Sequence, residues 1–521
     1  MKIANVPNPI LGTAFVLLLA SLSCNSPSLD FSDELADRTA TPTPLIETAQ
    51  PTGSVTEPGP TSSPSASPTA TPGPTMTPLA PPVDESKPLS SDGPWLVYQA
   101  RASHSGSGEN ATLFVVNEDG SGRRMLDQGI PSFYGLQISP EGDRIAYLQR
   151  NVDDIPHLVI RFVPSGEVET EITLISQSVL DGAATAQDLK DRLLDAVGRA
   201  DSIAWSPHGH YLGFVGALDG PSADLYRFDT WSNNIRRLSD EPRNVYQPSW
   251  SPDGTWIVHR VGEEIENDGI EGIAAVSFDG RNVKSLYPSN ANDFLVAWLD
   301  EENFLTSYDT RLGPLGLSRA DVDGSSLVVI TSAPVSYPEE MMFDGLREVI
   351  AVNLRADDPR VDGTLQAGIY LISMASGDAD LVLVGDWRSV EWWDGKGVFV
   401  ANGEQGTVFI RRTGEVVKEM AEIADPVALS PDGAWMVSYG DTGVTVYTHI
   451  GTHIRQVVDA AVAKVIWRPD SGGFFIDAYQ TNDPGHGHHL YMHDLGDWDL
   501  QLVDLDFRGA DFWIGPALST P

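Results

Sequence analysis

The chain has 521 residues, with 33 lysines and arginines against 73 aspartates and glutamates, a formal net charge of −40. So acidic a surface repels phosphate backbones and anionic lipid heads. It therefore excludes nucleic acid as an expected partner, and any membrane attachment needs an anchor. The chain is too long for one ordinary compact domain unless that domain is built from repeats. Apolar residues make up 41% of the chain, which is enough to form a large core. We interpret the acidity as a means of solubility, with selective cation binding as the alternative.

Residues 1–23 have the pattern of a lipoprotein-type signal peptide, with an apolar run over residues 10–20 that is too short to span a bilayer comfortably. The run leads into Ser21-Leu22-Ser23-Cys24, which resembles the bacterial lipobox, although lipoboxes prefer leucine where this chain has Ser21. Cys24 is the only cysteine, so the fold contains no internal disulfide. The resemblance implies lipid attachment at Cys24; cleavage that leaves a free thiol is the alternative.

Residues 24–91 are dominated by proline, threonine and serine, as in residues 39–44 and 63–68. Such a segment buries too little apolar surface to offset its chain entropy, so we expect a disordered stalk. Its prolines favour extended polyproline II geometry, with a reach on the order of 200 Å at full extension. A stalk of this kind would lift a folded head clear of the cell envelope.

From residue 92 to the end, short β-rich runs alternate with Gly/Asp/Pro turns around a recurring motif. Its clearest copy is Trp250-Ser251-Pro252-Asp253-Gly254, followed by the apolar run Trp256-Ile257-Val258. Other copies begin near Leu136, Ile203, Val427 and Val465, and worn ones near Val296, Met341 and Val390. Proline and Asp-Gly make a turn between two antiparallel strands, and two more strands follow, as in residues 225–229 and 236–238. Four strands at a period of about 37–50 residues predict the blades of an all-β propeller.

The motif resembles the TolB-like family of WD-like propeller repeats over roughly residues 92–518. The small N-terminal α/β domain of TolB is not matched, so a role in the Tol–Pal system is not implied. We predict a β-propeller domain over residues 92–521 with about eight four-stranded blades, seven to nine being allowed. Residues 95–98 look like a second strand without a first, so we expect residues 511–514 to supply it and close the ring, with Phe512 and Trp513 buried.

One segment breaks the period, because Leu189, Leu193, Leu194 and Val197 recur at helical spacing within residues 185–199. We predict a short amphipathic helix between two blades that caps the propeller edge; an insertion that contacts a partner or covers the pore is the alternative.

The segment Asp321-Val322-Asp323-Gly324 resembles the opening of an EF-hand loop, but Ser332 stands where that loop needs a bidentate acid. We expect it, and its counterparts at Glu118-Asp119-Gly120 and Phe278-Asp279-Gly280, to be turns between third and fourth strands.

A histidine-rich run holds the candidate metal ligands, Asp483, His486 and His488, with His489 and His493 nearby. No second cluster completes a site, so we favour an exposed polar loop over a metal centre. No glycine-rich phosphate loop or dinucleotide fingerprint is present, and no cofactor is expected.

TolB-like propellers also occur fused to prolyl-oligopeptidase hydrolases, but this chain has neither the Gly-x-Ser-x-Gly elbow nor a following α/β domain. We therefore assign no catalytic residue. The expected function is that of an extracytoplasmic, lipid-anchored binding or scaffold module for a protein, peptide or glycan, acting as a monomer at the cell surface or in the periplasm. The long loops after Arg260 and Arg355 would lie on one rim. The alternative is a hydrolase or lyase for glycans or lactones, which needs histidines and carboxylates that converge at a central channel.

Overall fold

The computed structural model describes residues 87–507 and 513–514. Gaps fall at 92, 102–110, 131–132, 151–153, 184–186, 241, 263–269, 289–293, 309–314, 326, 336–340, 358–360, 362–365 and 480–487. These residues belong to one compact unit, Pro72–Pro521. The expected signal peptide, Cys24 and nearly all of the expected stalk lie outside the described residues.

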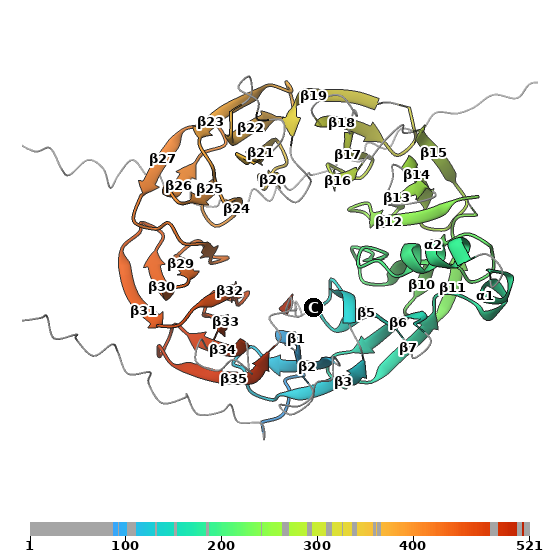
Figure 1. Ribbon diagram of the computed structural model, residues 1–521, viewed down its shortest axis with the longest axis horizontal. Coiled ribbons are helices and arrows are strands. Elements are labelled where there is room, and N and C mark those ends of the chain that lie inside the picture. Colours follow the sequence, from blue (N-terminus) through green and yellow to red (C-terminus); the bar gives the residue numbers. More distant parts are fainter. Residues whose placement is uncertain are drawn as a thin grey trace, which may run out of the picture. The chain divides into compact units, whose positions relative to one another are not determined.

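The described chain is a β-propeller of nine four-stranded antiparallel blades around one axis (Figure 1). Blade 1 joins β36 (Trp513–Ile514), from the end of the chain, to β1 (Trp95–Arg101), β2 (Ala111–Asn117) and β3 (Arg124–Ile130). Nine is the upper limit of the predicted range and one more than the expected eight. The eight recognised motifs all begin blades, and the ninth blade is the one completed by β36.

The other blades follow in chain order, each from its innermost to its outermost strand. Blades 2 to 5 are β4 (Phe133–Ile138), β5 (Arg144–Arg150), β6 (Pro156–Phe162), β7 (Val168–Thr173); β8 (Ile203–Trp205), β9 (Tyr211–Gly216), β10 (Asp224–Asp229), β11 (Asn234–Arg237); β12 (Asn244–Trp250), β13 (Trp256–Gly262), β14 (Ile270–Ser277), β15 (Val283–Pro288); and β16 (Phe294–Trp298), β17 (Asn303–Tyr308), β18 (Leu315–Asp321), β19 (Leu327–Val335). Blades 6 to 9 are β20 (Met341–Phe343), β21 (Val349–Leu354), β22 (Gly368–Ser373), β23 (Ala379–Val384); β24 (Ser389–Trp393), β25 (Val398–Gly403), β26 (Gly406–Ile410), β27 (Val416–Met420); β28 (Val427–Leu429), β29 (Trp435–Gly440), β30 (Gly443–Thr448), β31 (His453–Val458); and β32 (Val462–Trp467), β33 (Gly473–Tyr479), β34 (His488–Asp494), β35 (Leu500–Phe507).

The ring closes as the sequence predicts, because β36 pairs antiparallel with β1. Leu96 is paired with Ile514 and Val97 with Trp513. The sheets of blades 9 and 1 also meet directly, where Ala100 pairs with Phe507. The two ends of the described chain therefore share blade 1. The predicted burial of the Phe512 and Trp513 side chains lies outside what the structure describes.

The Ser-Pro-Asp-Gly motif is the turn between the first and second strands of a blade. In blade 4 the Ser251 hydroxyl donates to the Asp253 carboxylate at 2.6 Å and accepts from the Trp256 backbone N–H at 2.9 Å. Gly254 has a φ of 71°, which an L side chain rarely adopts, so glycine belongs there. The turn thus satisfies the first amide of the second strand and fixes where that strand starts.

Degenerate copies of the motif form the same turn, but other side chains make its hydrogen bonds. In blade 6 the Asp344 carboxylate takes the place of serine and accepts from the Val349 backbone N–H at 3.0 Å. In blade 9 Arg468 replaces serine and donates to Asp470 and Asp494 at 2.7 and 3.3 Å. The same arginine lies 3.2 Å from Glu118 of blade 1, so the departure from the motif adds an ion pair across the ring junction.

The core lies between blades, where the faces of neighbouring sheets meet. Each hydrophobic cluster joins at least two blades; one joins Trp95 and Val97 of blade 1 to Ile145 and Tyr147 of blade 2. Because each sheet buries both of its faces, its middle strands are nearly continuous apolar runs.

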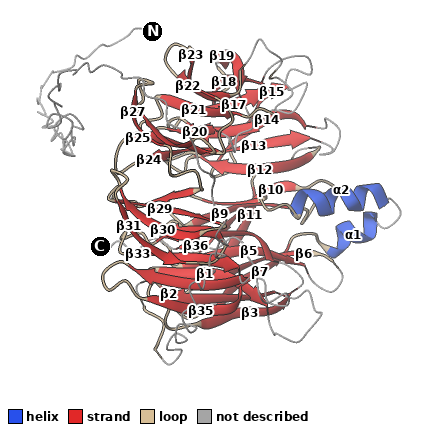
Figure 2. Ribbon diagram, turned by 60° about the vertical axis from the view of Figure 1, so that its left-hand side comes forward, coloured by secondary structure: helices blue, strands red, loops and turns tan. Residues whose placement is uncertain are grey.

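Between blades 2 and 3 lie two helices, α1 (Gln177–Ala183) and α2 (Gln187–Val197), side by side in Figure 2. The second is the predicted helix, and Leu193 and Val197 are fully buried in the cluster formed by blades 2 to 4. This packing confirms the edge-capping interpretation of α2. No helix in the described part of the chain is long and apolar enough to span a membrane.

The three Asp-Gly segments weighed as calcium loops are turns between third and fourth strands, as predicted. In the turn after β18, the Asp323 carboxylate accepts from the Ser325 backbone N–H at 2.7 Å. Hydrogen bonds from the side chain and backbone of Ser325 lower the pKa of Asp323.

Candidate functional site

The innermost strands surround the axis of the ring, and they carry almost no ionisable side chains. Among the nine of them, only Glu391 on β24 and Lys464 on β32 are charged, and none contains histidine or arginine. The two residues stand on different blades, 7 and 9. Convergent acids, bases and histidines, which the enzyme alternative needs, are therefore missing from these strands as the structure describes them.

Glu391 is the one acidic group on these strands, and burial raises its pKa. The nearby phenol of Tyr439, on β29 of blade 8, also has a raised pKa, first through burial and then through the charge of Glu391. A carboxyl with a raised pKa can act as a general acid, but cleavage of a glycosidic bond normally uses a second carboxyl group as well. No group of three or more histidine, cysteine, aspartate and glutamate side chains suitable for a metal ion occurs in the described part of the chain.

Of the three candidate metal ligands, His488 is described, while Asp483 and His486 lie outside the described residues. The Nδ1 atom of His488 lies 2.6 Å from the carboxylate of Asp477, a buried residue on the neighbouring strand β33. Burial raises the pKa of Asp477 more than His488 and Lys464 lower it. The pairing therefore gives His488 a carboxylate partner within its own blade.

The other two histidines of the run are buried in the same blade. His493 donates from Nδ1 to the Asp499 carbonyl oxygen at 2.9 Å, and burial lowers its pKa. His489 is buried as well, one residue after His488 on β34. Since successive side chains of a strand point to opposite faces, His488 and His489 cannot converge on one ion.

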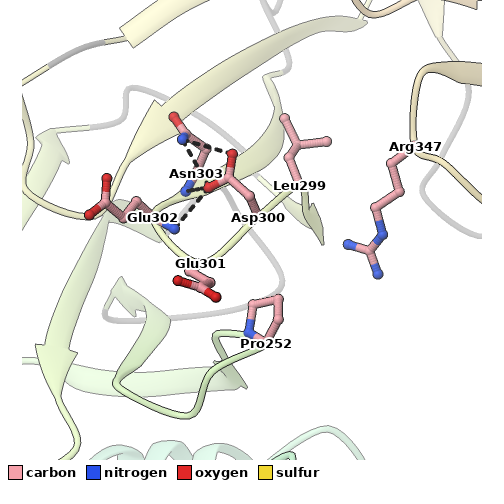
Figure 3. Close-up of a pocket in the computed structure, with 7 residues that line it drawn as sticks. All are labelled: Pro252, Leu299, Asp300, Glu301, Glu302, Asn303 and Arg347. Atoms are coloured by element: carbon pink, nitrogen blue, oxygen red, sulfur yellow. Dashed lines mark hydrogen bonds between the residues drawn. The ribbon is translucent and has the colours of Figure 1, made fainter. Parts of the chain in front are cut away.

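A cavity of about 610 Å³ opens where the first-to-second-strand turns of blades 4, 5 and 6 come together (Figure 3). It is lined by Pro252 of blade 4, by Leu299, Asp300, Glu301, Glu302 and Asn303 of blade 5, and by Arg347 of blade 6. We call this the acidic pocket. Three acidic residues and one arginine line it, so its charge favours a ligand that carries positive groups.

Asp300 organises the blade 5 side of the acidic pocket. Its carboxylate accepts from the backbone N–H groups of Glu302 and Asn303, at 2.9 and 2.8 Å, and from the Asn303 side chain at 2.9 Å (Figure 3). Burial pulls the pKa of Asp300 upward, but these hydrogen bonds outweigh it and lower the pKa. Asp300 thus stays ionised and holds the turn that presents the exposed side chains of Glu301 and Glu302.

Arg347 supplies the opposite wall of the pocket from a strained turn. Its φ is 56°, in the left-handed region that non-glycine residues rarely occupy, and its backbone N–H donates to the Asp344 carbonyl oxygen at 2.9 Å. In Figure 3 its guanidinium lies across the pocket from Asp300 and Glu302.

Sequence reasoning interpreted residues 296–300 as a worn blade motif and did not detect this pocket. One signal was present, since Asp300-Glu301-Glu302 stands where other blades carry Pro-Asp-Gly. The long loops after Arg260 and Arg355 join second to third strands in blades 4 and 6, which places both at the same end of their blades. Most of these two loops lies outside the described residues.

No protein-family model matches the chain. A curated protein of Bacillus subtilis (strain 168), described as the uncharacterized peptidase YuxL, is 38% identical over 73 residues, which are 13% of this chain. The chain spans only 11% of that relative's length.

Solved structures show likeness in fold alone. A eukaryotic initiation factor has a TM-score of 0.52 at 11% identity, covering 82% of this chain and 99% of that one. TolB from Acinetobacter baumannii has a TM-score of 0.32 at 14% identity, covering 56% and 63%. An oligogalacturonate lyase in complex with manganese has a TM-score of 0.34 at 15% identity, covering 57% and 89%.

Proposed function

We propose that the protein is an extracytoplasmic, lipid-anchored propeller that acts as a binding or scaffold module for a protein, peptide or glycan. Residues 1–23 direct export, Cys24 carries the lipid, residues 24–91 form the stalk, and residues 92–521 form the binding head, as a monomer. The position of the only cysteine directly after a signal-like run supports the anchor, and the composition of residues 24–91 supports the stalk.

The observation that carries the choice of binding over catalysis is the chemistry of the innermost strands. Only Glu391 and Lys464 are charged among the described residues of those strands, and they stand on different blades. An active site of a glycan hydrolase or lyase needs two or more ionisable groups within reach of one bond. A wall of backbone and neutral side chains suits recognition instead.

The acidic pocket is the contact site that we propose for the ligand, and its charge favours a basic peptide segment. Glu301 and Glu302 are exposed at its edge, and Arg347 excludes cations from one wall, so the positive groups would meet the blade 5 side. Attraction between exposed charges is screened by salt, so binding should weaken from low ionic strength to about 0.15 M.

The test uses the full chain in detergent micelles and a fluorescent peptide of alternating lysine and alanine. The double variant Glu301→Gln, Glu302→Gln should bind the peptide several-fold more weakly than the native protein. The matched control, Glu404→Gln with Glu419→Gln, removes the same charge from exposed sites on blade 7 and should leave binding unchanged. Equal binding by both variants would remove the pocket from the proposal. A glycan- or lactone-cleaving activity lost in Glu391→Gln but kept in Glu404→Gln would replace binding by catalysis.

The anchor is tested by Cys24→Ala, which should move the protein from the membrane fraction to the soluble extracytoplasmic fraction. The control Ser23→Ala keeps a small residue before the cysteine and should leave the protein in the membrane fraction. Membrane retention of Cys24→Ala would contradict lipidation.

A further inference from the structure

Trp231 is an exposed tryptophan on a propeller that buries nearly all of its large rings. It lies in the turn between β10 and β11 of blade 3, and its side chain is 76% exposed. It alone is exposed among the tryptophans whose side chains the structure describes. Its exposed indole presents a wide flat apolar face to solvent, on which a ligand with a matching face can pack.

The turn that carries Trp231 is rigidly held. The Asp229 carboxylate accepts from the backbone N–H groups of Trp231 and Ser232, at 3.0 and 3.1 Å. The backbone N–H and the hydroxyl of Thr230 both donate to the His210 carbonyl oxygen, each at 3.0 Å. The imidazole of His210 lies 4.0 Å from the indole, centre to centre. The indole is therefore supported from one side and open on the rest of its surface, which lowers the entropy cost of binding.

The residues that follow Trp231 in the turn are polar and uncharged rather than apolar. Ser232, Asn233 and Asn234 follow it directly and are all exposed, and the nearest exposed aliphatic side chain in sequence is Ile235. A stable protein partner buries about 800 Å² on each side around an apolar centre. One aromatic ring within a rim of amides and hydroxyls offers too little apolar area for that.

We propose that Trp231, supported by His210, is a binding platform for neutral oligosaccharides of pyranose rings with equatorial substituents. Such a ring presents a flat face of axial C–H groups, which packs on an open indole, while its hydroxyls at the edge match the donors and acceptors of Ser232, Asn233 and Asn234. The net charge of −40, with the Asp229 carboxylate bound to the backbone of the same turn, disfavours sugars that carry carboxylates or sulfates. This site is separate from the acidic pocket and does not depend on its ligand.

A second tryptophan occupies the corresponding turn of blade 9 and serves as the control. Trp498 lies between β34 and β35, but it is partly buried against the core of blades 8 and 9. Its ring centre is 5.6 Å from that of His493 and 5.8 Å from the Arg455 guanidinium. The same residue type in the same turn is therefore packed against the core in blade 9 and largely exposed beside His210 in blade 3.

The experiment measures binding of cellohexaose and chitohexaose to the full-length protein in detergent by isothermal titration calorimetry. The native protein should bind at least one of them, and Trp231→Ala should weaken binding at least about tenfold. Trp231→Phe, which keeps a smaller flat ring, should give an intermediate affinity. Trp498→Ala should keep the native affinity even though it lowers the melting temperature. Val384→Ala, at an exposed apolar residue of β23, is the control that leaves packing intact.

Three results would overturn the proposal: no binding of either sugar by the native protein, native affinity in Trp231→Ala, or stronger binding of polygalacturonate than of the neutral sugars. The native protein could instead bind neither sugar but capture an envelope protein that Trp231→Ala does not capture. That result would mean that Trp231 binds a protein partner and not a glycan. Sugar binding should be insensitive to salt and unchanged in Glu301→Gln, Glu302→Gln, so its failure is distinguishable from failure of the acidic pocket.

Discussion

Two junctions of the ring are held by the same three residue types, yet the chain connects their blades in different ways. Each junction has a tyrosine on a second strand, an arginine, and an aspartate on the outermost strand of the preceding blade. The triads are Tyr98, Arg123 and Asp504 between blades 9 and 1, and Tyr147, Arg161 and Asp127 between blades 1 and 2. The two interfaces are therefore held together by the same set of hydrogen bonds between one blade and the outermost strand of the preceding blade.

The geometry of the two triads is nearly identical. At the 9–1 junction the tyrosine hydroxyl donates to Asp504 at 2.9 Å, and the guanidinium donates to the hydroxyl at 2.9 Å and to Asp504 at 2.6 Å. At the 1–2 junction the corresponding distances, with Asp127 as acceptor, are 2.6, 2.8 and 2.6 Å. Any difference in their contribution to stability must therefore come from what surrounds them.

Chain connectivity is that difference. Blades 1 and 2 are consecutive in the chain, so their contact closes a short loop. The chain passes from blade 9 only into β36, so blade 9 and β36 are held to β1, β2 and β3 by non-local contacts, including the pairing of β36 with β1. If the triad at the 9–1 junction is lost, both ends of the chain can separate from the ring. At the 1–2 junction the chain itself still connects the two blades after the triad is lost. We therefore expect the same interaction to contribute unequally to stability at two junctions of one ring.

The largest effect is expected from deleting residues 508–521, which removes β36. The edge of β1 would lose its strand partner next to Leu96 and Val97, which are both buried. We expect a loss of about 3 kcal/mol of unfolding free energy, or roughly 5 °C in melting temperature. Deleting only residues 515–521 keeps β36 and is the control. Equal melting temperatures for the two deletions would mean that β36 does not close the ring.

The next effect comes from Asp504→Ala compared with Asp127→Ala. Each substitution leaves a partly buried guanidinium without its carboxylate, which costs about 3 kcal/mol in buried pairs. We expect the larger loss for Asp504→Ala, because Asp504 is the more buried of the two, at 5% against 18% side-chain exposure, and it joins the free ends. Urea unfolding curves measure both. A larger loss for Asp127→Ala would reverse the comparison.

A smaller effect is expected from Tyr98→Phe and Tyr147→Phe, which keep the buried rings and remove only the hydroxyls. Each loses one hydrogen bond to a carboxylate and one from a guanidinium, for about 1 to 2 kcal/mol. Combined with the aspartate variants in a double-mutant cycle, they measure the coupling within each triad. Additive effects would show that hydroxyl and carboxylate act independently.

The effect that is smallest at neutral pH is a dependence of stability on pH, which appears only above pH 10. Burial is the largest cause that raises the pKa of both tyrosines; the aspartates add to it, and the arginines lower the pKa without cancelling the rise. Because the folded-state pKa lies above the unfolded value near 10, the stabilisation is complete below pH 10 and is lost as the pH rises further. The native protein should lose up to about 1.4 kcal/mol per pH unit for each tyrosine relative to the Tyr98→Phe, Tyr147→Phe variant. Parallel stability profiles from pH 9 to 11 would contradict the raised pKa values.

Much of this fold is readable from the sequence, because each blade repeats a turn whose chemistry is local. Ser-Pro-Asp-Gly needs only its own few residues to form, so all eight motifs found in the sequence mark real inner strands. The expected strand partner for residues 95–98 was also correct, since an unmatched second strand predicts a missing first one. Helix α1, by contrast, was not predicted, as its seven residues carry too short a pattern.

The candidate sites were much less predictable. The acidic pocket combines turns from three blades, so Pro252 and Arg347 have no relation in the sequence. His488 was singled out correctly as a polar group of interest, but its partner Asp477 lies on another strand and was not foreseen. The sequence did indicate that Trp231 is unusual. It is followed by Ser232, Asn233 and Asn234, which are typical of a turn, whereas a tryptophan is more often found in a buried strand.

The shared blade 1 also sets the order of events during synthesis. The ribosome makes β1 among the first strands of the ring and β36 last, so the blade begun first is completed last. At typical elongation rates the interval is roughly 20–80 s, during which the edge of β1 has no native partner. Over that time the nascent chain has the backbone edge that domain-swapped dimers and aggregates use. Factors that keep the nascent chain unfolded until synthesis is complete would therefore raise the yield of the closed ring.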